Sequence, residues 1–385
     1  MLSAASIVVC AGLAIGLAYG AVGLASGFCL MSGLRGWWVD GDSRLIRTFA
    51  LALAVAVAAT QLLAGYGLFD PGKSVYLLPS FSVPLMFAGG ILFGYGMVLA
   101  NGCGSRALVL LGRGNLRSFV VVIVLGIAAQ MTLRGLVAPA RVALLQASLS
   151  KPALLSLPAL LAGLAGSESF ARPLVASVIA AALISFAFAH APFRRSGGQI
   201  AAGIAVGLLV TAGWFATGYL GADDFNPTAV TSLTFIAPIA DTVQYVMLST
   251  GLTLNFGIAM VAGVFAGSLL TAIATRRFHL EGYTSPRHML RSITGAALMG
   301  SGGAMALGCS VGQGLTGLST LALSSFVAAG GILLGSAAGL RGPLRAPPLE
   351  VQDGKAKTES ARRKVQGGKN ARRQADRNDV SSRNA

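Results

Sequence analysis

The sequence predicts an all-α polytopic membrane protein with about nine transmembrane helices and several short re-entrant helices. Of its 385 residues, 54% are hydrophobic and only 11% are charged, and the mean hydropathy is +0.72. These values lie far outside the averages of soluble proteins. Apolar runs near the roughly 20 residues that cross a bilayer recur along the chain. The 51 glycines suit the close helix contacts and broken helices of a multi-span bundle.

Nine runs are expected to cross the membrane. They are residues 3–30, 48–68, 82–100, 118–137, 173–190, 198–220, 252–274, 289–307 and 321–340. The apolar stretch 106–111 after Cys103 is too short to cross, so we expect a re-entrant half-helix there and a second one after Cys309. Residues 226–250 contain Pro227 and Pro238, which favour short helices over a full crossing.

The composition divides the chain into a membrane domain, residues 1–340, and a basic tail, residues 341–385. We expect the membrane domain to consist of two halves, about 1–137 and 173–340. Prolines interrupt the segment 138–172 between them, which is predicted to form a surface helix pair with a loop. The tail is expected to be a disordered cytoplasmic segment that fixes topology or contacts anionic lipid. Binding of nucleic acid is not predicted.

The distribution of basic residues predicts the orientation of the spans. With the tail in the cytoplasm, twelve arginines fall in inner loops: Arg35, Arg44, Arg47, Arg106, Arg113, Arg117, Arg194, Arg195, Arg276, Arg277, Arg287 and Arg291. Five basic residues fall in outer loops: Lys73, Arg134, Arg141, Lys151 and Arg172. Because basic residues favour the cytoplasmic side, we expect the N-terminus outside and the C-terminus inside.

Two glycine-rich stretches, residues 94–105 and 302–312, each contain one cysteine where an apolar run breaks. With Cys103 and Cys309 in register, three further positions match: Gly96 with Gly302, Ala100 with Ala306, and Gly102 with Gly308. In the predicted orientation, the spans before the two cysteines run in opposite directions. This predicts an inverted pseudo-two-fold repeat, an arrangement in which a transporter holds its substrate between broken helices near the membrane centre.

The four cysteines, Cys10, Cys29, Cys103 and Cys309, form no CxxC pair, so neither a disulfide framework nor a metal site is expected. No cofactor is predicted. Free backbone amides at a half-helix N-terminus attract anions, and a neutral thiol can donate a hydrogen bond to a soft, sulfur-bearing anion. The alternative is that the glycines serve only helix packing. Cys10 lacks glycine-rich neighbours and is expected to be a small apolar residue. The predicted supporting residues are Gly102, Gly104, Ser105, Gly308, Ser310 and Gly312.

Three more polar residues are candidate members of the site. Arg106 could neutralise an anion at the inner exit, or it could be a positive-inside anchor. Asp241 and Gln244 lie beside Pro238 in a stretch predicted to dip into the membrane, where a polar pair suggests a function.

Around these cysteines the sequence resembles the YeeE/YedE family of inner-membrane sulfur-compound transporters, some of which take up thiosulfate. The resemblance rests on Ser-Gly-Phe-Cys-Leu-Met-Ser-Gly at 26–33, Asn-Gly-Cys-Gly-Ser-Arg at 101–106 and Gly-Cys-Ser-Val-Gly-Gln-Gly at 308–314. It implies an hourglass-shaped bundle in the cell inner membrane. It also implies a passage in which Cys29, Cys103 and Cys309 hand thiosulfate along by transient S–H···S hydrogen bonds. A soluble sulfur-carrier or rhodanese-like protein at the cytoplasmic face is a further implied partner.

Two alternatives remain open at this stage. A selenium compound or another sulfur oxyanion would suit the same thiol lining. A membrane thiol-disulfide oxidoreductase is the alternative from another class, but such enzymes need paired, exposed cysteines with a lowered pKa, whereas these thiols are single and widely spaced. We therefore expect a transporter of thiosulfate, or of a close sulfur-containing anion, and not an enzyme.

Overall fold

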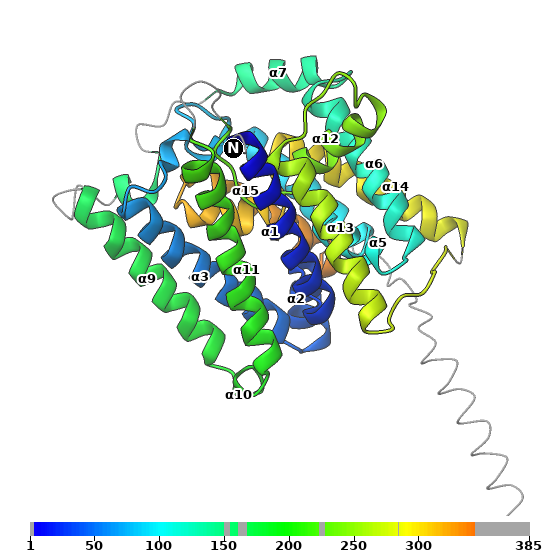
Figure 1. The fold of residues 1–385 in the computed structure, drawn as a ribbon, viewed down its shortest axis with the longest axis horizontal. Helices are drawn as coiled ribbons and strands as arrows, with labels where there is room; N and C mark the ends of the chain where they lie inside the picture. The colour runs from blue at the N-terminus through cyan, green and yellow to red at the C-terminus, as the bar shows by residue number, and fades with distance from the viewer. Residues whose placement is uncertain (1–3, 150–154, 161–167, 223–227, 284, 343–385) are drawn as a thin grey trace, which may run out of the picture. The chain divides into compact units, whose positions relative to one another are not determined.

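The computed structural model describes residues 4–149, 155–160, 168–222, 228–283 and 285–342. Helices make up the fold of this part, which contains no β-strand, only two isolated bridges, Asn115 with Glu281 and Ser156 with Ala322. Eight of the described helical segments are long and apolar enough to cross a membrane. The prediction of an all-α polytopic membrane protein is therefore confirmed (Figure 1).

The first half of the chain forms six α-helices with three short turns of other helix types. They are α1 (Ala4–Ser26), α2 (Leu30–Arg35), the π-helical η1 (Gly36–Asp40), α3 (Arg44–Gly65), the 3₁₀ turns η2 (Pro71–Lys73) and η3 (Val75–Leu77), α4 (Val83–Leu99), α5 (Gly104–Gly112) and α6 (Leu116–Leu133). Side chains cap two of these α-helices: the hydroxyl of Ser82 accepts from the Leu85 amide, and the Asn115 side chain accepts from the Ser118 amide. Helix α5 confirms the half-helix predicted after Cys103.

The remaining described elements follow in order. They are α7 (Ala138–Ala147), α9 (Glu168–Phe188), α10 (Ala191–Arg194), α11 (Gly197–Phe215) with its π-helical extension η4 (Ala216–Leu220), α12 (Ile236–Met247), α13 (Phe256–Ala274), α14 (Pro286–Met305), the π-helical η5 (Gly312–Gly317) and α15 (Leu323–Leu340). Helix α12 is the short helix predicted for 226–250. Helix α7 lies where a surface helix was expected, but 150–154 and 161–167 lie outside the described residues. The predicted tail from 343 onward does too.

Most predicted spans match a helix to within about four residues at each end, and two of the differences have a clear physical reason. The first run, predicted as 3–30, ends as a helix at Ser26, because Gly27 adopts a left-handed φ of 74°. The run 289–307 is helix α14, but it is not among the eight sufficiently apolar segments. It carries Arg287, His288 and Arg291. Because α14 packs against both α4 and α6, much of its surface is covered by protein and need not be apolar.

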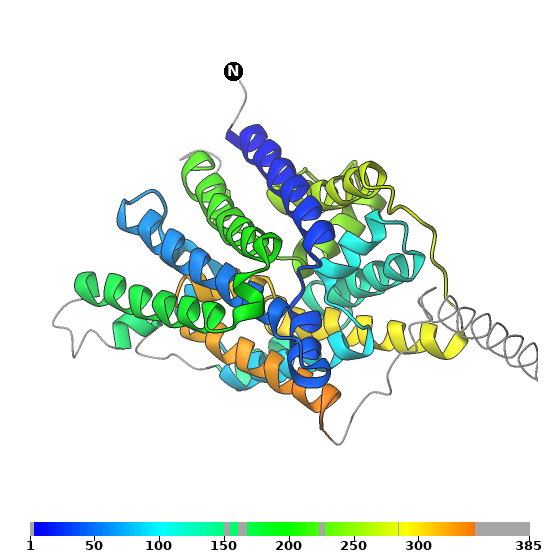
Figure 2. The ribbon, with the colours of Figure 1, turned by 90° about the horizontal axis from the view of Figure 1, so that it is seen from below.

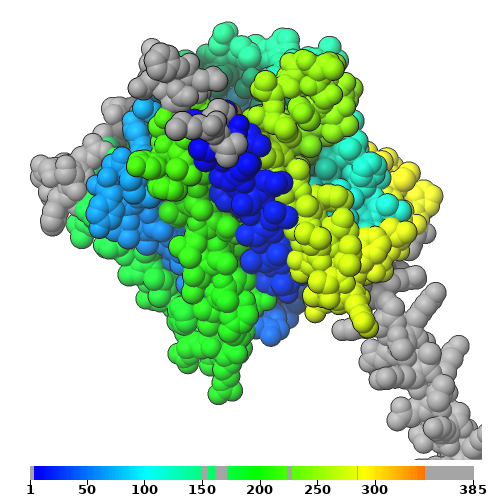
Figure 3. All heavy atoms as spheres, in the orientation of Figure 1, coloured from blue at the N-terminus to red at the C-terminus, as the bar shows by residue number. Residues whose placement is uncertain are grey.

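Glycine faces bring the long helices into close contact. Helix α1 packs against α13 and α11, as Figure 1 shows, and Figure 2 gives the same neighbours from below. In the space-filling view, α1 runs along the surface between these two helices (Figure 3). A Cβ built at Gly16 would lie 2.3 Å from the Met260 carbonyl oxygen, and one at Gly94 would lie 2.2 Å from that of Ile332. Only glycine permits helix backbones to approach this closely.

Helices α4 and α14 run antiparallel where they touch. The Cβ position of Gly89 faces the backbone at Gly302, and that of Gly96 faces the backbone at Gly295. Residue numbers thus rise on one helix as they fall on the other. The two helices that precede Cys103 and Cys309 therefore lie side by side and point in opposite directions.

A polar cluster joins the loop after α5 to the loop after α13. The Glu281 carboxylate accepts from Arg113 Nη2 at 2.9 Å, from Asn115 Nδ2 at 2.8 Å and from His279 Nε2. Burial alone would raise the pKa of the Glu281 carboxyl, but the hydrogen bond from His279 and the charge of Arg113 outweigh it and hold this pKa below its usual value. The folded state therefore favours the ionised carboxylate.

Glu281→Gln is expected to lower thermal stability at pH 7 by about 0.2–1 kcal/mol, the size of a solvent-accessible ion pair. Since the folded pKa is depressed, the stabilisation is present above the unfolded pKa, near 4.3, and is lost as the pH falls through the folded value. Melting temperatures of the purified wild type and variant should thus differ at pH 7, and the difference should shrink as the pH falls below about 4.3. A difference that stays constant with pH would show that the charge is not its source.

Candidate functional site

Three breaks between helices share one backbone geometry. In each, a residue with positive φ ends a helix and a cysteine follows two positions later. The positive-φ residues are Gly27 (74°), Asn101 (56°) and Leu307 (56°). After Asn101, the Gly102 amide donates back to the Met97 carbonyl at 3.0 Å. This is the hydrogen bond of a Schellman cap, which turns the chain away from the helix axis.

The cysteines stand where the next helical segments begin. Cys29 is the N-cap of α2 and Cys103 is the N-cap of α5, both with extended backbone. At the third break, the Gly312 amide donates to Cys309 Sγ at 3.2 Å and the Gln313 amide donates to the Cys309 carbonyl at 2.7 Å. Each thiol thus lies beside backbone amides of a new helical turn, the groups that favour negative charge.

The fold brings these thiols into its interior. Cys29 is 3% exposed, and Cys103 and Cys309 are each 1% exposed. The Sγ atoms of Cys29 and Cys103 are 3.7 Å apart, and Cys103 Sγ lies 3.2 Å from Ser105 Oγ. All are free thiols, whereas Cys10, which is also free, is exposed on α1. No cluster that could hold a metal ion occurs among the residues that the structure describes.

Tyr19 is a member of this group that the sequence did not indicate. It is 1% exposed on α1, it interacts with Ser105 and electrostatically with Cys29, Cys103 and Cys309, and its hydroxyl makes no well-formed hydrogen bond to the described residues. A buried hydroxyl without a well-formed hydrogen bond is uncommon and calls for a ligand or another explanation. The only sequence signal was a tyrosine inside an apolar, glycine-rich span, a pattern shared by many core residues.

Two more buried polar groups lie next to Cys309. The Ser310 hydroxyl and the Gln313 Oε1 atom have no hydrogen-bond partner in the described part of the chain, although Gln313 Nε2 donates to the Ala306 carbonyl at 2.6 Å. Ser310 was predicted to support the site, whereas Gln313 was not. The Tyr19 and Ser310 hydroxyls and the Gln313 Oε1 atom are thus buried polar groups that the described residues leave without a well-formed hydrogen bond.

The predicted glycines have packing roles as well. A Cβ at Gly312 would lie 2.5 Å from Thr234 Oγ1, and one at Gly308 would lie 3.0 Å from Gln313 Cγ. At Gly104 the nearest atom would be Leu125 Cδ1 at 3.1 Å, whereas Gly102 has ordinary space. The packing explanation and the substrate explanation therefore apply to the same positions, and they do not exclude one another.

Arg106 and the pair Asp241 and Gln244 lie in different surroundings. Arg106 donates to the Gly23 carbonyl at 3.2 Å and interacts electrostatically with Cys29, so a positive charge lies close to the thiols. Asp241 accepts from Arg134 at 2.9 Å, and Gln244 accepts from Gln130 at 2.5 Å. These bonds join α12 to α6, and no contact of this pair with the thiols occurs among the described residues.

The chain is similar to known proteins over most of its length. Residues 25–338 match a family described as sulphur transport, a range that contains all three breaks. The thiosulfate transporter TsuA of Escherichia coli is 26% identical over 316 residues, which cover 79% of this chain and 86% of that protein. The thiosulfate transporter TsuA of Spirochaeta thermophila is 26% identical over 344 residues, 84% of this chain and 96% of that protein. The chain belongs to the sulphur transport family, the YeeE/YedE family that its cysteine motifs resemble.

Proposed function

We propose that this protein carries thiosulfate across the inner membrane into the cytoplasm through a passage lined by Cys29, Cys103 and Cys309. The observation that carries the proposal is the convergence of three buried, free thiols from three separate helix breaks, two of them 3.7 Å apart. Both relatives described above are named thiosulfate transporters. Their coverage of most of the chain supports the same substrate here.

The chemistry of the lining suits an anion with both soft and hard atoms. Thiosulfate presents one terminal sulfur and three oxygens. The thiols donate weak S–H hydrogen bonds to the sulfur, and the hydroxyls of Tyr19 and Ser310 donate to the oxygens. Arg106 supplies a nearby positive charge. An unpaired anion in the membrane interior would be strongly unfavourable, so these donors together replace its water shell.

Weak contacts also allow release. Transport requires binding that is strong enough to admit the ion and weak enough to let it leave, which several adjacent sites achieve better than one strong site. A thiol is a weak donor. No bond forms or breaks in this passage, and the protein acts without catalysis.

Helix packing supports two inverted halves around this passage. We infer that helices α1, α3, α4 and α6 of the first half correspond to α11, α13, α14 and α15 of the second. Equivalent pairs then pack together in both halves. The contact of α1 with α13 matches that of α11 with α3, and the contact of α4 with α15 matches that of α14 with α6. The antiparallel contact of α4 and α14 lies at the centre of this scheme. The expected orientation places the N-terminus outside and the C-terminus in the cytoplasm, where a soluble sulfur-carrier protein would accept the substrate.

Uptake of radiolabelled thiosulfate into proteoliposomes tests the proposal. Purified wild-type protein should accumulate label above empty vesicles, and unlabelled thiosulfate should compete, whereas sulfate, which lacks the terminal sulfur, should compete poorly. The number of free thiols should stay at four after turnover. Loss of thiols together with absent uptake would instead favour the oxidoreductase alternative. In that case Cys29 and Cys103, whose Sγ atoms are 3.7 Å apart, would be the pair that forms a disulfide.

Tyr19→Phe is expected to lower uptake at low thiosulfate concentration by about tenfold to a hundredfold. The variant keeps the ring that packs on Phe235 at 5.2 Å and removes only the hydroxyl. A hydrogen bond to a charged group contributes about 1.5–3 kcal/mol, and about 1.4 kcal/mol is a factor of ten. Tyr219→Phe, at a position 53% exposed, should transport as the wild type does. Equal transport by both variants would remove Tyr19 from the site.

A further inference from the structure

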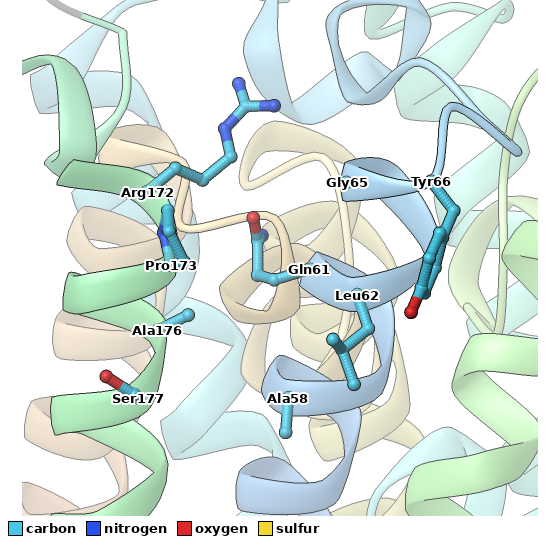
Figure 4. Close-up of a pocket in the computed structure, with 9 residues that line it drawn as sticks. All are labelled: Ala58, Gln61, Leu62, Gly65, Tyr66, Arg172, Pro173, Ala176 and Ser177. Atoms are coloured by element: carbon cyan, nitrogen blue, oxygen red, sulfur yellow. The ribbon is translucent and has the colours of Figure 1, made fainter. Parts of the chain in front are cut away.

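A cavity of about 820 Å³ lies between α3 and α9, outside the group of thiols. The residues that line it are polar at one end and mainly apolar at the other (Figure 4). Arg172 and the amide of Gln61 lie at one end, and Ala58, Leu62 and Ala176 lie at the other. Ser177 also lies at this second end, but its hydroxyl donates to the Leu174 carbonyl of its own helix at 2.8 Å. The cavity is therefore amphipathic, with a cationic and amide-bearing end and an apolar end.

The polar end lies at the level where both helices leave the apolar layer. Arg172 is the second residue of the apolar segment Ala171–Phe188. Tyr66, which also lines the cavity, is the C-cap of α3. Arginine and tyrosine are typical of the membrane–water interface. Ala58 precedes Tyr66 by eight residues, or about 12 Å along the helix, so the apolar end reaches into the hydrocarbon region.

We propose that this cavity binds an anionic phospholipid, with the phosphate at Arg172 and an acyl chain between α3 and α9. A guanidinium presents several donors in a geometry that matches phosphate oxygens. An acyl chain fills an apolar space at this depth, whereas a water-soluble anion would use the polar end alone. The size lies within the range of small-molecule sites, about 300–1,000 Å³.

Hydrogen bonds connect the wall of the cavity to the segment between η5 and α15 and to α11. Gln61 Nε2 donates to the Ser319 carbonyl at 2.7 Å. The Ser319 hydroxyl donates to the Thr316 carbonyl at 2.7 Å and accepts from Trp214 Nε1 at 3.2 Å. The main packing partner of α9 is α3. A lipid between the two helices therefore braces α9 and supports the segment that follows η5.

Thermal melting of the full-length protein in detergent tests the site, with dioleoyl phosphatidylglycerol, dioleoyl phosphatidylcholine and inorganic phosphate as probes. Phosphatidylglycerol should raise the melting temperature by about 5 °C through preferential binding to the folded state. Phosphatidylcholine, with the same chains, should raise it by less than half as much, and inorganic phosphate should leave it unchanged. A shift with phosphate alone would indicate a free-anion site and overturn the lipid assignment.

Variants locate the effect. Arg172→Gln should remove the difference between the two lipids, and Ala58→Trp, which fills the apolar end, should remove the response to both. Matched controls are Arg195→Gln, an exposed arginine away from the cavity, and Val178→Trp, at a position on α9 that is 60% exposed. Both controls should keep the full shift. Should Ala58→Trp fail to fold, Arg172→Gln alone decides: an unchanged preference for phosphatidylglycerol would overturn the proposal. Since melting does not require transport, failure here leaves the proposed function untouched.

Discussion

Cys103→Ala is expected to lower thiosulfate uptake into proteoliposomes by about tenfold to a hundredfold, because it removes a hydrogen bond to a charged substrate. Cys103 is the thiol with the most partners, because its Sγ atom lies near both Cys29 Sγ and Ser105 Oγ. Removing it interrupts the series of donors at its centre. The replacement is small and apolar, and the site is 1% exposed, so the fold should remain intact.

Two companion variants sharpen this result. Cys10→Ala changes an exposed cysteine on the same protein and should transport like the wild type. Cys103→Ser replaces the thiol with a hydroxyl, which still donates a hydrogen bond but lacks the polarisable sulfur. Uptake between that of the wild type and that of Cys103→Ala would show that hydrogen-bond donation and the sulfur atom contribute separately. Melting temperatures should confirm that all three are folded. Normal uptake by a folded Cys103→Ala protein would contradict the thiol passage.

Gly331→Ala is expected to destabilise the protein strongly, by about 1–3 kcal/mol or more, and to reduce the yield of folded material. A Cβ at this position on α15 would lie 2.4 Å from the Phe87 carbonyl oxygen and 3.1 Å from Gly90 Cα. Both obstacles are backbone atoms of α4, so neither can move without separating the helices. Thermal melting in detergent measures the loss.

The neighbouring residue is a matched control. A Cβ at Gly330 meets no atom within 4 Å, and alanine is the better helix former by about 1 kcal/mol. Gly330→Ala should therefore be neutral or slightly stabilising. If the two variants melted at the same temperature, the close contact between α15 and α4 would not be essential to the fold.

Local composition predicted most of the helices correctly. The run 252–274 corresponds to α13 (Phe256–Ala274), and the run 321–340 corresponds to α15 (Leu323–Leu340), because an apolar segment of this length has few other stable arrangements in a bilayer. The end of the first run was placed too late. Phe28, Cys29 and Leu30 continue its apolar character, so hydropathy cannot detect the positive φ at Gly27 that ends α1.

The candidate site was predictable only in part. Cys103 and Cys309 stand out by their glycine neighbours, and Cys29 was assigned through the family resemblance. Tyr19 was missed, because its importance depends on the direction of one side chain within α1. Asp241 was singled out as a polar residue at depth, but the structure pairs it with Arg134. That partner lies 107 residues away in the sequence, and no local pattern connects the two.

By itself the sequence determined the membrane class, the main crossing segments and the positions of the breaks at Cys103 and Cys309, because hydropathy and glycine content act over one helix at a time. Only the tertiary structure decided that Cys29 meets Cys103 across 74 residues, while Cys10 faces outward on α1. The physical reason is that helix packing sets which side of a helix faces inward. Glycines such as Gly16 approach backbone atoms more than 200 residues away, and this long-range fit orients Tyr19 and the thiols.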